Sequence, residues 1–184
     1  MKEARVVDIG DGRIFAGYQD KLIHIYKQAF GEPPWNEIFT NNEVKDWFAE
    51  MMSCSGKIVL ALCVEYELIG GTFCVNADLK HDVWQYLPTS VKKQEVIYLA
   101  ESFINPAYQR KGLGKILHDR RLEIARKQGY KYALQRTNEQ SGMYALIQRT
   151  CFKEIGRQIV ISCKTINGVI KEYPDERVIS LKKL

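Results

Sequence analysis

Residues 104–117 read INPAYQRKGLGKIL, and this stretch decides the fold. A β-rich run, EVIYLAESFIN, leads into it, and an amphipathic basic segment from Gly112 to Gln128 follows. The pattern predicts a strand that turns into a helix. Glycines at 112 and 114 let a ligand approach the backbone at the start of the helix, where N–H groups lack acceptors. The corner is therefore expected to bind an anion such as a phosphate.

Two common phosphate-binding loops do not fit the spacing. A Walker A loop needs GxxxxGK[ST], but the residue five before Gly114 is Gln109, and Ile116 follows Lys115. A dinucleotide fingerprint needs GxGxxG, but the residue three after Gly114 is Leu117. The simpler alternative is a plain turn with solvated lysines.

Positive charge is concentrated around this corner. The formal net charge is only +5. Between Tyr108 and Lys131, however, the acidic residues are Asp119 and Glu123, against a larger basic set at positions 110, 111, 115, 120, 121, 126, 127 and 131. Such a patch favours an anionic partner.

Length and composition favour one domain spanning residues 1–184, because 184 residues with 46% hydrophobic content can bury a single core. The five cysteines form no CxxC, and the three histidines do not cluster, so neither a disulfide framework nor a metal site is expected. The charged N-terminus and the lack of a long apolar run favour a cytoplasmic protein without a membrane span.

Strand and helix patterns alternate along the chain and predict an α/β or α+β fold around one sheet. The long polar segment 78–94 is either a functional flap or partly helical. The remaining elements are expected as a strand at 4–9, helices at 22–30 and 42–52, a hairpin from KIVLALCV and LIGGTFCV, the strand and helix described above, a strand in YKYALQRT, a helix at 139–150, and a C-terminal hairpin around Asn167-Gly168.

The run IxPxYQRKGLG resembles the acyl-CoA-binding motif Q/R-x-x-G-x-G/A of the GNAT family of N-acetyltransferases, here Gln109, Gly112 and Gly114. The order of predicted elements is similar over nearly the whole chain, and FGEPPWNE resembles the acceptor side of some members. The resemblance implies one mixed, mostly antiparallel sheet flanked by helices. It also implies acetyl-CoA as co-substrate, no metal, and a small-molecule or peptide amine as acceptor.

The same resemblance implies a cofactor site of known outline. Backbone amides from Gln109 to Gly114 would cradle the pyrophosphate, the strand before them would pair with the pantetheine arm, and Asn138 would add a polar contact. The cofactor-binding residues expected in this way are Ser102, Phe103, Ile104, Gln109, Arg110, Lys111, Gly112, Leu113, Gly114, Lys115 and Asn138.

Glu101 is the candidate general base. Strict strand alternation would place it on one face with Ile97, Leu99 and Phe103, and a carboxylate among apolar neighbours has a raised pKa suited to proton transfer. A bulge in this strand, which the family has, would change that facing. The alternative is a structural glutamate paired with a cation from the next strand.

The chain departs from the family at the usual general acid. The family's Y-x-x-x-G-F has its tyrosine at the position of Ile147 here, and Cys151 replaces the glycine. Tyr144 lies three residues earlier on the same helix face and is the candidate acid, with a core or rim tyrosine as the alternative. Cys151 is a poor candidate nucleophile, because no histidine lies near it in sequence.

These observations support an acetyl-CoA-dependent N-acetyltransferase. An acyl-CoA-binding module with little catalysis is the alternative, motivated by the missing tyrosine. A nucleic-acid-binding protein is less favoured, because the phosphates of coenzyme A account for the basic patch. The acceptor amine, the acyl-chain preference and the oligomeric state, for which a dimer is one option, are open.

Overall fold

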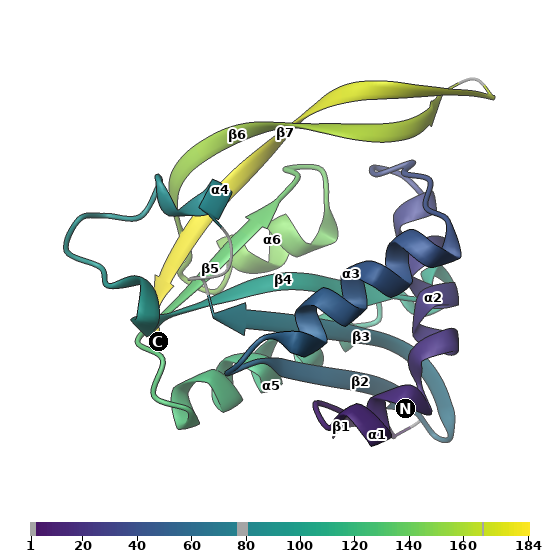
Figure 1. The fold of residues 1–184 in the computed structure, drawn as a ribbon, viewed down its shortest axis with the longest axis horizontal. Coiled ribbons are helices and arrows are strands. Elements are labelled where there is room, and N and C mark those ends of the chain that lie inside the picture. Colours follow the sequence, from purple (N-terminus) through teal and green to yellow (C-terminus); the bar gives the residue numbers. More distant parts are fainter. Residues whose placement is uncertain (1–2, 77–80, 167) are drawn as a thin grey trace.

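A single sheet organises the chain in the computed structural model, which describes residues 3–76, 81–166 and 168–184 (Figure 1). Within that part the sheet has seven strands in the order β1-β2-β3-β4-β5-β7-β6. Only β4 and β5 pair in parallel, so the expected mixed, mostly antiparallel sheet is confirmed. The strands are β1 (Ala4–Asp8), β2 (Ile58–Val64), β3 (Glu67–Asn76), β4 (Val96–Ile104), β5 (Tyr132–Thr137), β6 (Lys153–Ile166) and β7 (Val169–Lys183).

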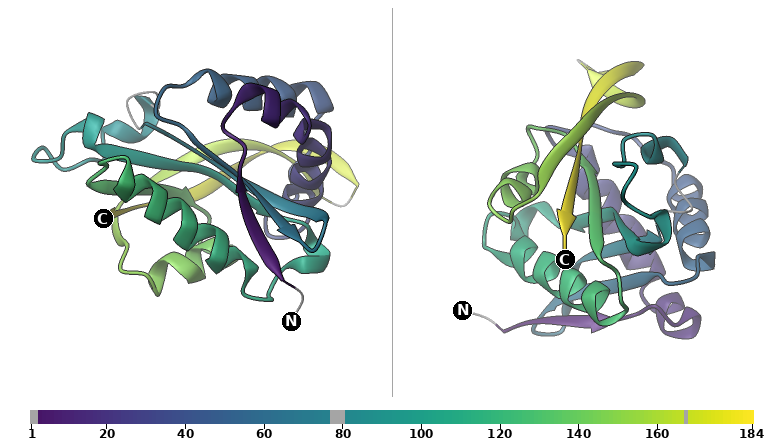
Figure 2. Two further views of the ribbon diagram at one scale, coloured as in Figure 1. Left: turned by 90° about the horizontal axis from the view of Figure 1, so that it is seen from below. Right: turned by 90° about the vertical axis from the view of Figure 1, so that its left-hand side faces the viewer.

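Helices cover both faces of the sheet (Figure 2). One core cluster lies under α2 and α3, and a second lies between the sheet and the helices α5 and α6. The helices are α1 (Gly12–Ala16), α2 (Gln19–Gly31), α3 (Asn41–Ser53), α4 (His81–Trp84), α5 (Leu113–Lys127) and α6 (Gly142–Gln148), with short 3-10 turns at Lys93–Glu95 and Pro106–Tyr108.

Local sequence chemistry explains where these helices begin. Thr40 caps α3 through its side chain and forms a capping box with Glu43. Ser141 accepts a hydrogen bond from the backbone of Tyr144 and so begins α6 later than the expected 139–150 helix. The short helix α1 is not among the elements expected from the sequence, and Asp11 caps it by accepting hydrogen bonds from the backbone of Arg13 and Ile14. Segment 78–94 is partly helical where it is described, from position 81 onward.

Strands β4 and β5 separate soon after they meet. Their register covers only Val96–Tyr98 against Tyr132–Leu134. Just beyond, the Gln135 side chain donates to the Leu99 carbonyl across 3.2 Å in place of a backbone pair. The C-terminal half of β4 pairs with β3 on its other side. Its edge toward β5 is therefore open to another extended chain.

A register shift opposite this opening reverses the facing of β4. Before the shift, Tyr98 lies in the cluster under α2 and α3, whereas Ile97 and Leu99 lie in the α5 cluster. After it, Phe103 joins the α2–α3 cluster. The expectation that Glu101 shares one face with Ile97, Leu99 and Phe103 is therefore wrong, because the bulge breaks the alternation.

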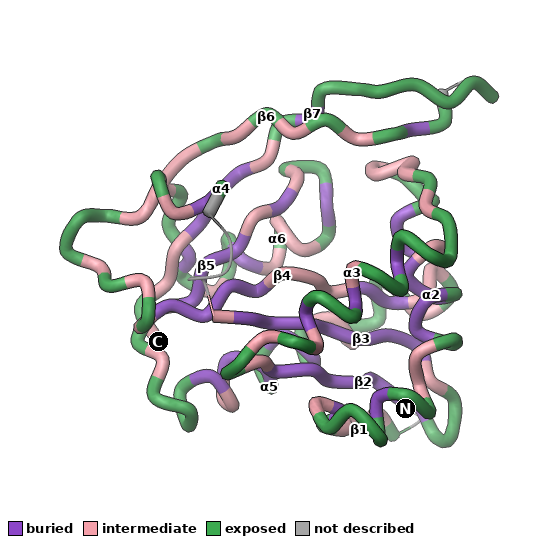
Figure 3. The backbone as a smooth tube through the Cα atoms, in the orientation of Figure 1, coloured by how far each residue is buried: buried purple, intermediate pink, exposed green. Residues whose placement is uncertain are grey.

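The expected C-terminal hairpin is confirmed for β6 and β7, although Asn167 of its turn lies outside the described residues. The hairpin rises above the rest of the sheet as a twisted arm that is exposed along much of its length (Figures 1 and 3). None of the helices in the described residues is both long and apolar enough to span a membrane.

Candidate active site

The corner that joins β4 to α5 is an open backbone turn. Gly112 is the N-cap of α5 with φ 79°, a left-handed conformation that favours glycine. A Cβ at this position would meet nothing within 4 Å. Arg110 also has positive φ, at 57°. Asn105 begins the turn by accepting a hydrogen bond from the backbone of Ala107 at 3.0 Å.

After Gln109 N, which donates to the Pro106 carbonyl, the next backbone donor with an acceptor at this corner is Lys115 N. Lys115 N donates to the Gly112 carbonyl at 3.0 Å in a 3-10-type first turn, and Ile116 N donates to the same carbonyl at 3.4 Å. The N–H groups from Arg110 to Gly114 have no acceptor among the described residues. They lie at the positive end of a 15-residue helix. The arrangement suits a phosphate group.

The side chains around the corner are arranged on its rim. Gln109 Nε2 donates to the Ile104 carbonyl at 3.0 Å and ties the loop to β4. Lys111 Nζ donates to the Ala107 carbonyl at 2.8 Å. Lys115 pairs with Asp119 one turn along α5, and the side chain of Lys115 stays 63% exposed. Exposed contacts of this kind are weak, so both lysines can turn toward an anion.

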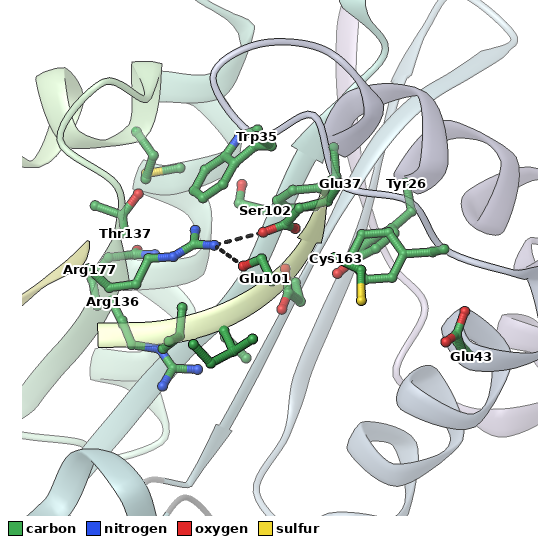
Figure 4. Close-up of a pocket in the computed structure, with 18 of the residues that line it drawn as sticks. Tyr26, Trp35, Glu37, Glu43, Glu101, Ser102, Arg136, Thr137, Cys163 and Arg177 are labelled. Atoms are coloured by element: carbon green, nitrogen blue, oxygen red, sulfur yellow. Dashed lines mark hydrogen bonds and ion pairs between the residues drawn. The ribbon is translucent and has the colours of Figure 1, made fainter. Parts of the chain in front are cut away.

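A pocket of about 380 Å³ lies beside the opening between β4 and β5 (Figure 4). Its walls come from α2, the loop 32–39, α3, β4, β5, α6 and the arm. The lining residues are Tyr26, Phe30, Trp35, Glu37, Ile38, Phe39, Glu43, Tyr98, Ala100, Glu101, Ser102, Gln135, Arg136, Thr137, Met143, Val160, Ile161, Ser162, Cys163 and Arg177.

Glu101 lies in this pocket at the bulge of β4. Although part of its surface is accessible, burial raises the pKa of its carboxyl to about 7, and the negative charge of Glu37 adds to the rise. The positive charge of Arg136 lowers the pKa of Glu101 and so offsets part of this rise. A carboxyl with this pKa is half ionised near neutrality and can accept a proton there.

The loop 32–39 forms the roof of the pocket and is fastened to the arm. Ile38 N donates to the Cys163 carbonyl at 3.2 Å, and Thr165 N donates to the Asn36 carbonyl at 3.0 Å. A buried ion pair of 2.7 Å joins Glu37 to Arg177 Nη2. These contacts connect segments more than a hundred residues apart in the chain.

Arg177 is also the centre of a buried charge cluster. Its Nη2 lies 2.7 Å from Asp175, which in turn lies 3.3 Å from Lys164 Nζ. Its guanidinium carbon lies 4.4 Å from the centre of the Trp35 ring. The arginine charge is therefore already balanced by carboxylates within the wall.

The other expected site residues are placed as follows. Ser102 lines the pocket, whereas Phe103 and Ile104 are buried in the two cores. Asn138 Nδ2 donates to Asp175 Oδ1 at 2.9 Å, so this side chain holds the end of β5 to the arm. Tyr144 is not among the lining residues and packs against the α5 cluster, in which Ile147 is fully buried.

Sequence reasoning missed the contribution of the arm to the pocket. It suggested FGEPPWNE as the acceptor side, and Phe30, Trp35 and Glu37 of this segment line the pocket. It gave no role to Arg136, Arg177 or the β6 residues. An alternating strand pattern shows which residues share a face, but it does not reveal which distant loop that face will meet.

Comparisons with known proteins identify the family and the fold of this chain. The family model described as Acetyltransferase (GNAT) family matches residues 20–151. No curated protein sequence matches the chain. Among solved structures, an N-acetyltransferase from Staphylococcus aureus is 14% identical over 98% of both chains with a TM-score of 0.71. A ribosomal-protein-alanine N-acetyltransferase from Brucella melitensis is 16% identical over 99% of both chains with a TM-score of 0.67.

A third structure, a Salmonella typhimurium protein solved with its cofactor acetyl-CoA, is 15% identical. It aligns over 100% of this chain and 94% of its own, with a TM-score of 0.66. At such identities, these likenesses establish a shared fold.

Proposed function

Because the chain belongs to the GNAT family of acetyltransferases and takes its acetyl group from acetyl-CoA, we propose that it acetylates a primary amine with Glu101 as general base. In the proposed reaction, the amine nitrogen attacks the thioester carbonyl carbon directly. The amine proton passes to the Glu101 carboxylate, and the C–S bond breaks with its electron pair moving to sulfur. The acceptor is a small molecule or a peptide.

The described residues fit acetyl-CoA in two ways. The N–H groups from Arg110 to Gly114 are free to receive the pyrophosphate, and no Cβ obstructs Gly112. The β4 edge near Ser102 to Ile104 has no strand partner toward β5 and can take an extended arm. We propose that these groups bind the cofactor, with Lys111 and Lys115 adding charge.

The raised pKa of Glu101 is the observation that carries the catalytic assignment. An ordinary surface glutamate is too weak a base near neutrality to take a proton efficiently. Glu37 is a second carboxylate in the pocket, but Arg177 holds it in an ion pair. Glu101 is therefore the better placed proton acceptor.

Replacing the base tests this proposal. Glu101→Gln should lower the maximal rate of thiol release roughly a hundredfold or more, within the usual range for a lost general base. It should leave acetyl-CoA affinity nearly unchanged, because the carboxyl lies away from the phosphate corner. Raising the pH should restore part of the rate, since more acceptor is then neutral.

Glu37→Gln is the matched control, because it removes a carboxylate from the same pocket without removing the proposed base. Its maximal rate should fall by less than about tenfold. In the unmodified enzyme, turnover should rise with pH through about 7 as Glu101 loses its proton. Equal rates for Glu101→Gln and the parent enzyme would assign Glu101 a structural role.

An acyl-CoA-binding module with little catalysis is the second candidate. Ile147 stands where the family's tyrosine would be, and Tyr144 lies outside the pocket lining. Screening amines, aminoglycosides, amino acids and peptide N-termini for thiol release separates the two candidates. The cytoplasmic location, the absence of a nucleic-acid partner and the option of a dimer stay predictions.

A further inference from the structure

Arg121 is fully buried between α5 and the sheet. Its Nη2 donates to Gln135 Oε1 at 2.8 Å and to His118 Nδ1 at 2.8 Å. Its Nη1 donates to Thr72 Oγ1 at 3.1 Å. Every one of these acceptors is an uncharged group.

No carboxylate of the described residues forms an ion pair with Arg121. Burial, followed by the charge of Arg121, lowers the pKa of His118 to about 2, so the imidazole is neutral. Burial raises the pKa of the nearby Cys74 thiol, which therefore stays protonated. Arginine keeps its proton at any ordinary pH. Among the described residues, the structure thus holds a buried positive charge without a counter-ion, an arrangement that costs stability.

This charge lies directly behind the opening between β4 and β5. Gln135, which accepts from Arg121, also donates to the Leu99 carbonyl of β4 at 3.2 Å. Thr72, which also accepts from Arg121, donates to the Glu101 carbonyl of β4 at 2.5 Å. Met143 Sδ, 3.5 Å from Arg121 Nη2, belongs to a residue of the pocket wall, as does Gln135. The guanidinium is therefore one side chain away from the pocket at the β4 bulge.

We propose that Arg121 is a positioning residue whose uncompensated charge stabilises the coenzyme A thiolate as it leaves. The inference rests on the proposed transfer reaction. When the C–S bond breaks, its electron pair stays on sulfur, the acetyl group remains on the acceptor nitrogen, and the amine proton goes to Glu101. The negative charge then develops in the opening in front of Arg121, where a low-dielectric surrounding strengthens the attraction.

The other charged groups of the site do not supply this potential as directly. Arg136 is paired with Asp82, and Arg177 is paired with Glu37 and Asp175. Glu101 carries the opposite sign when ionised and disfavours a thiolate. Arg121 also explains how the enzyme can work with Ile147 at the position of the usual acid, since a stabilised thiolate leaves without protonation.

The pKa of the thiol in bound coenzyme A measures the effect of the Arg121 charge, and this measurement needs no acceptor amine. Its pKa can be followed through the ultraviolet absorbance of the thiolate in a complex saturated with coenzyme A. The pKa of the bound thiol should lie at least about one unit below the ordinary thiol value near 8.5. A bound thiol that titrates like free coenzyme A would overturn the inference.

Variants of Arg121 then test whether its positive charge causes the lowered thiol pKa. Arg121→Gln should raise the thiol pKa to about its free value, while Arg121→Lys, which keeps the charge, should retain most of the lowering. Desulfo-coenzyme A should bind the parent and both variants with similar affinity, because it lacks the sulfur. An unchanged thiol pKa in a folded Arg121→Gln protein counts against the proposal.

A second pair of variants covers the case in which Arg121→Gln does not fold. Thr72→Asp places a carboxylate beside Arg121 Nη1, and Thr72→Asn is its neutral control of the same shape. The aspartate variant should lose the lowered thiol pKa and the asparagine variant should keep it; the same titration in both contradicts the proposal. Because these titrations need neither an amine nor Glu101, a silent Glu101→Gln would refute the proposed base without affecting their outcome.

Discussion

The corner before α5 and the pocket under the loop 32–39 differ in whether their polar groups have partners within the protein. At the corner, N–H groups from Arg110 to Gly114 have no acceptor among the described residues, and the neighbouring lysines are exposed. In the pocket, Arg136, Arg177 and Glu37 are all engaged with protein partners, and burial raises the pKa of the Glu101 carboxyl to about 7, which is near neutrality. The corner thus offers positive charge and backbone donors to an anion. The pocket holds one titratable carboxyl among side chains whose charges are already paired.

This difference shows which property each region contributes. A nest of backbone donors binds any phosphate of suitable shape, so the corner contributes affinity. A pocket whose charges are internally balanced gives an acceptor little electrostatic attraction, so in the proposed reaction its shape would contribute selectivity and Glu101 the chemistry. Damage to the two regions should therefore appear in different measurements.

The largest expected effect comes from placing a charge at the corner. Gly112→Asp sets a carboxylate against the pyrophosphate, and two like charges about 4 Å apart near a protein surface repel by about 4 kcal/mol. Acetyl-CoA affinity measured by calorimetry should fall roughly a thousandfold. Gly112→Asn is the matched control, because asparagine tolerates the same left-handed backbone without the charge. Equal losses in both variants would indicate backbone strain in place of repulsion.

A smaller effect is expected on stability when the pocket loses its carboxyl. Between about pH 4.5 and pH 7, the unfolded chain has released the Glu101 proton while the folded chain keeps it, so folded stability falls as pH rises through this window. Glu101→Gln removes that penalty and should raise the free energy of unfolding by up to about 3 kcal/mol at pH 8. Most of the gain should disappear at pH 5.

Denaturant titration of both proteins at the two pH values measures this gain. A gain of equal size at pH 5 and pH 8 would show that the carboxyl does not titrate with a raised pKa. The expected outcome pairs lost activity with gained stability, which is the trade-off of a functional group held in an unfavourable site. No such gain is expected from substitutions at the exposed corner.

The smallest effect is expected at Tyr144. A general acid typically contributes about a hundred- to ten-thousandfold, but Tyr144 packs against the α5 cluster outside the pocket lining. Tyr144→Phe should therefore lower the maximal rate by no more than about threefold. Ile147→Tyr should gain no proton donor either, because position 147 is fully buried in the same cluster. A loss of tenfold or more in Tyr144→Phe would restore it as the acid.

The sequence predicted the corner far better than the pocket, for a physical reason. The strand, the turn, Gly112 and the helix are consecutive, so glycine conformation and helix-end chemistry are visible in one stretch. The pocket brings together Tyr26, Glu37, Glu101 and Arg177, which are far apart in the chain. Only tertiary packing brings them together.

The face of β4 on which Glu101 lies also could not be predicted from local sequence. Alternation correctly separates Ile97 from Tyr98, because both precede the bulge. It fails at Phe103, because the extra residue is set by pairing with β3. The choice of Glu101 as base, with a raised pKa, came from its residue type and its expected apolar neighbours, whereas the observed rise comes from burial in the pocket and from the charge of Glu37, which is distant in sequence.

The register of the arm determines how much change in length the protein can tolerate. Val160 and Ser162 reach the pocket because β6 pairs with β7 in a fixed register that ends at Ile166 and Val169. One residue inserted into β6 below that end would shift its register against β7 and displace Val160 and Ser162 from their places in the pocket wall. Matched insertions on both strands beyond Ile166 and Val169 would only lengthen the arm. Natural variation in length should therefore be confined to the tip of the arm.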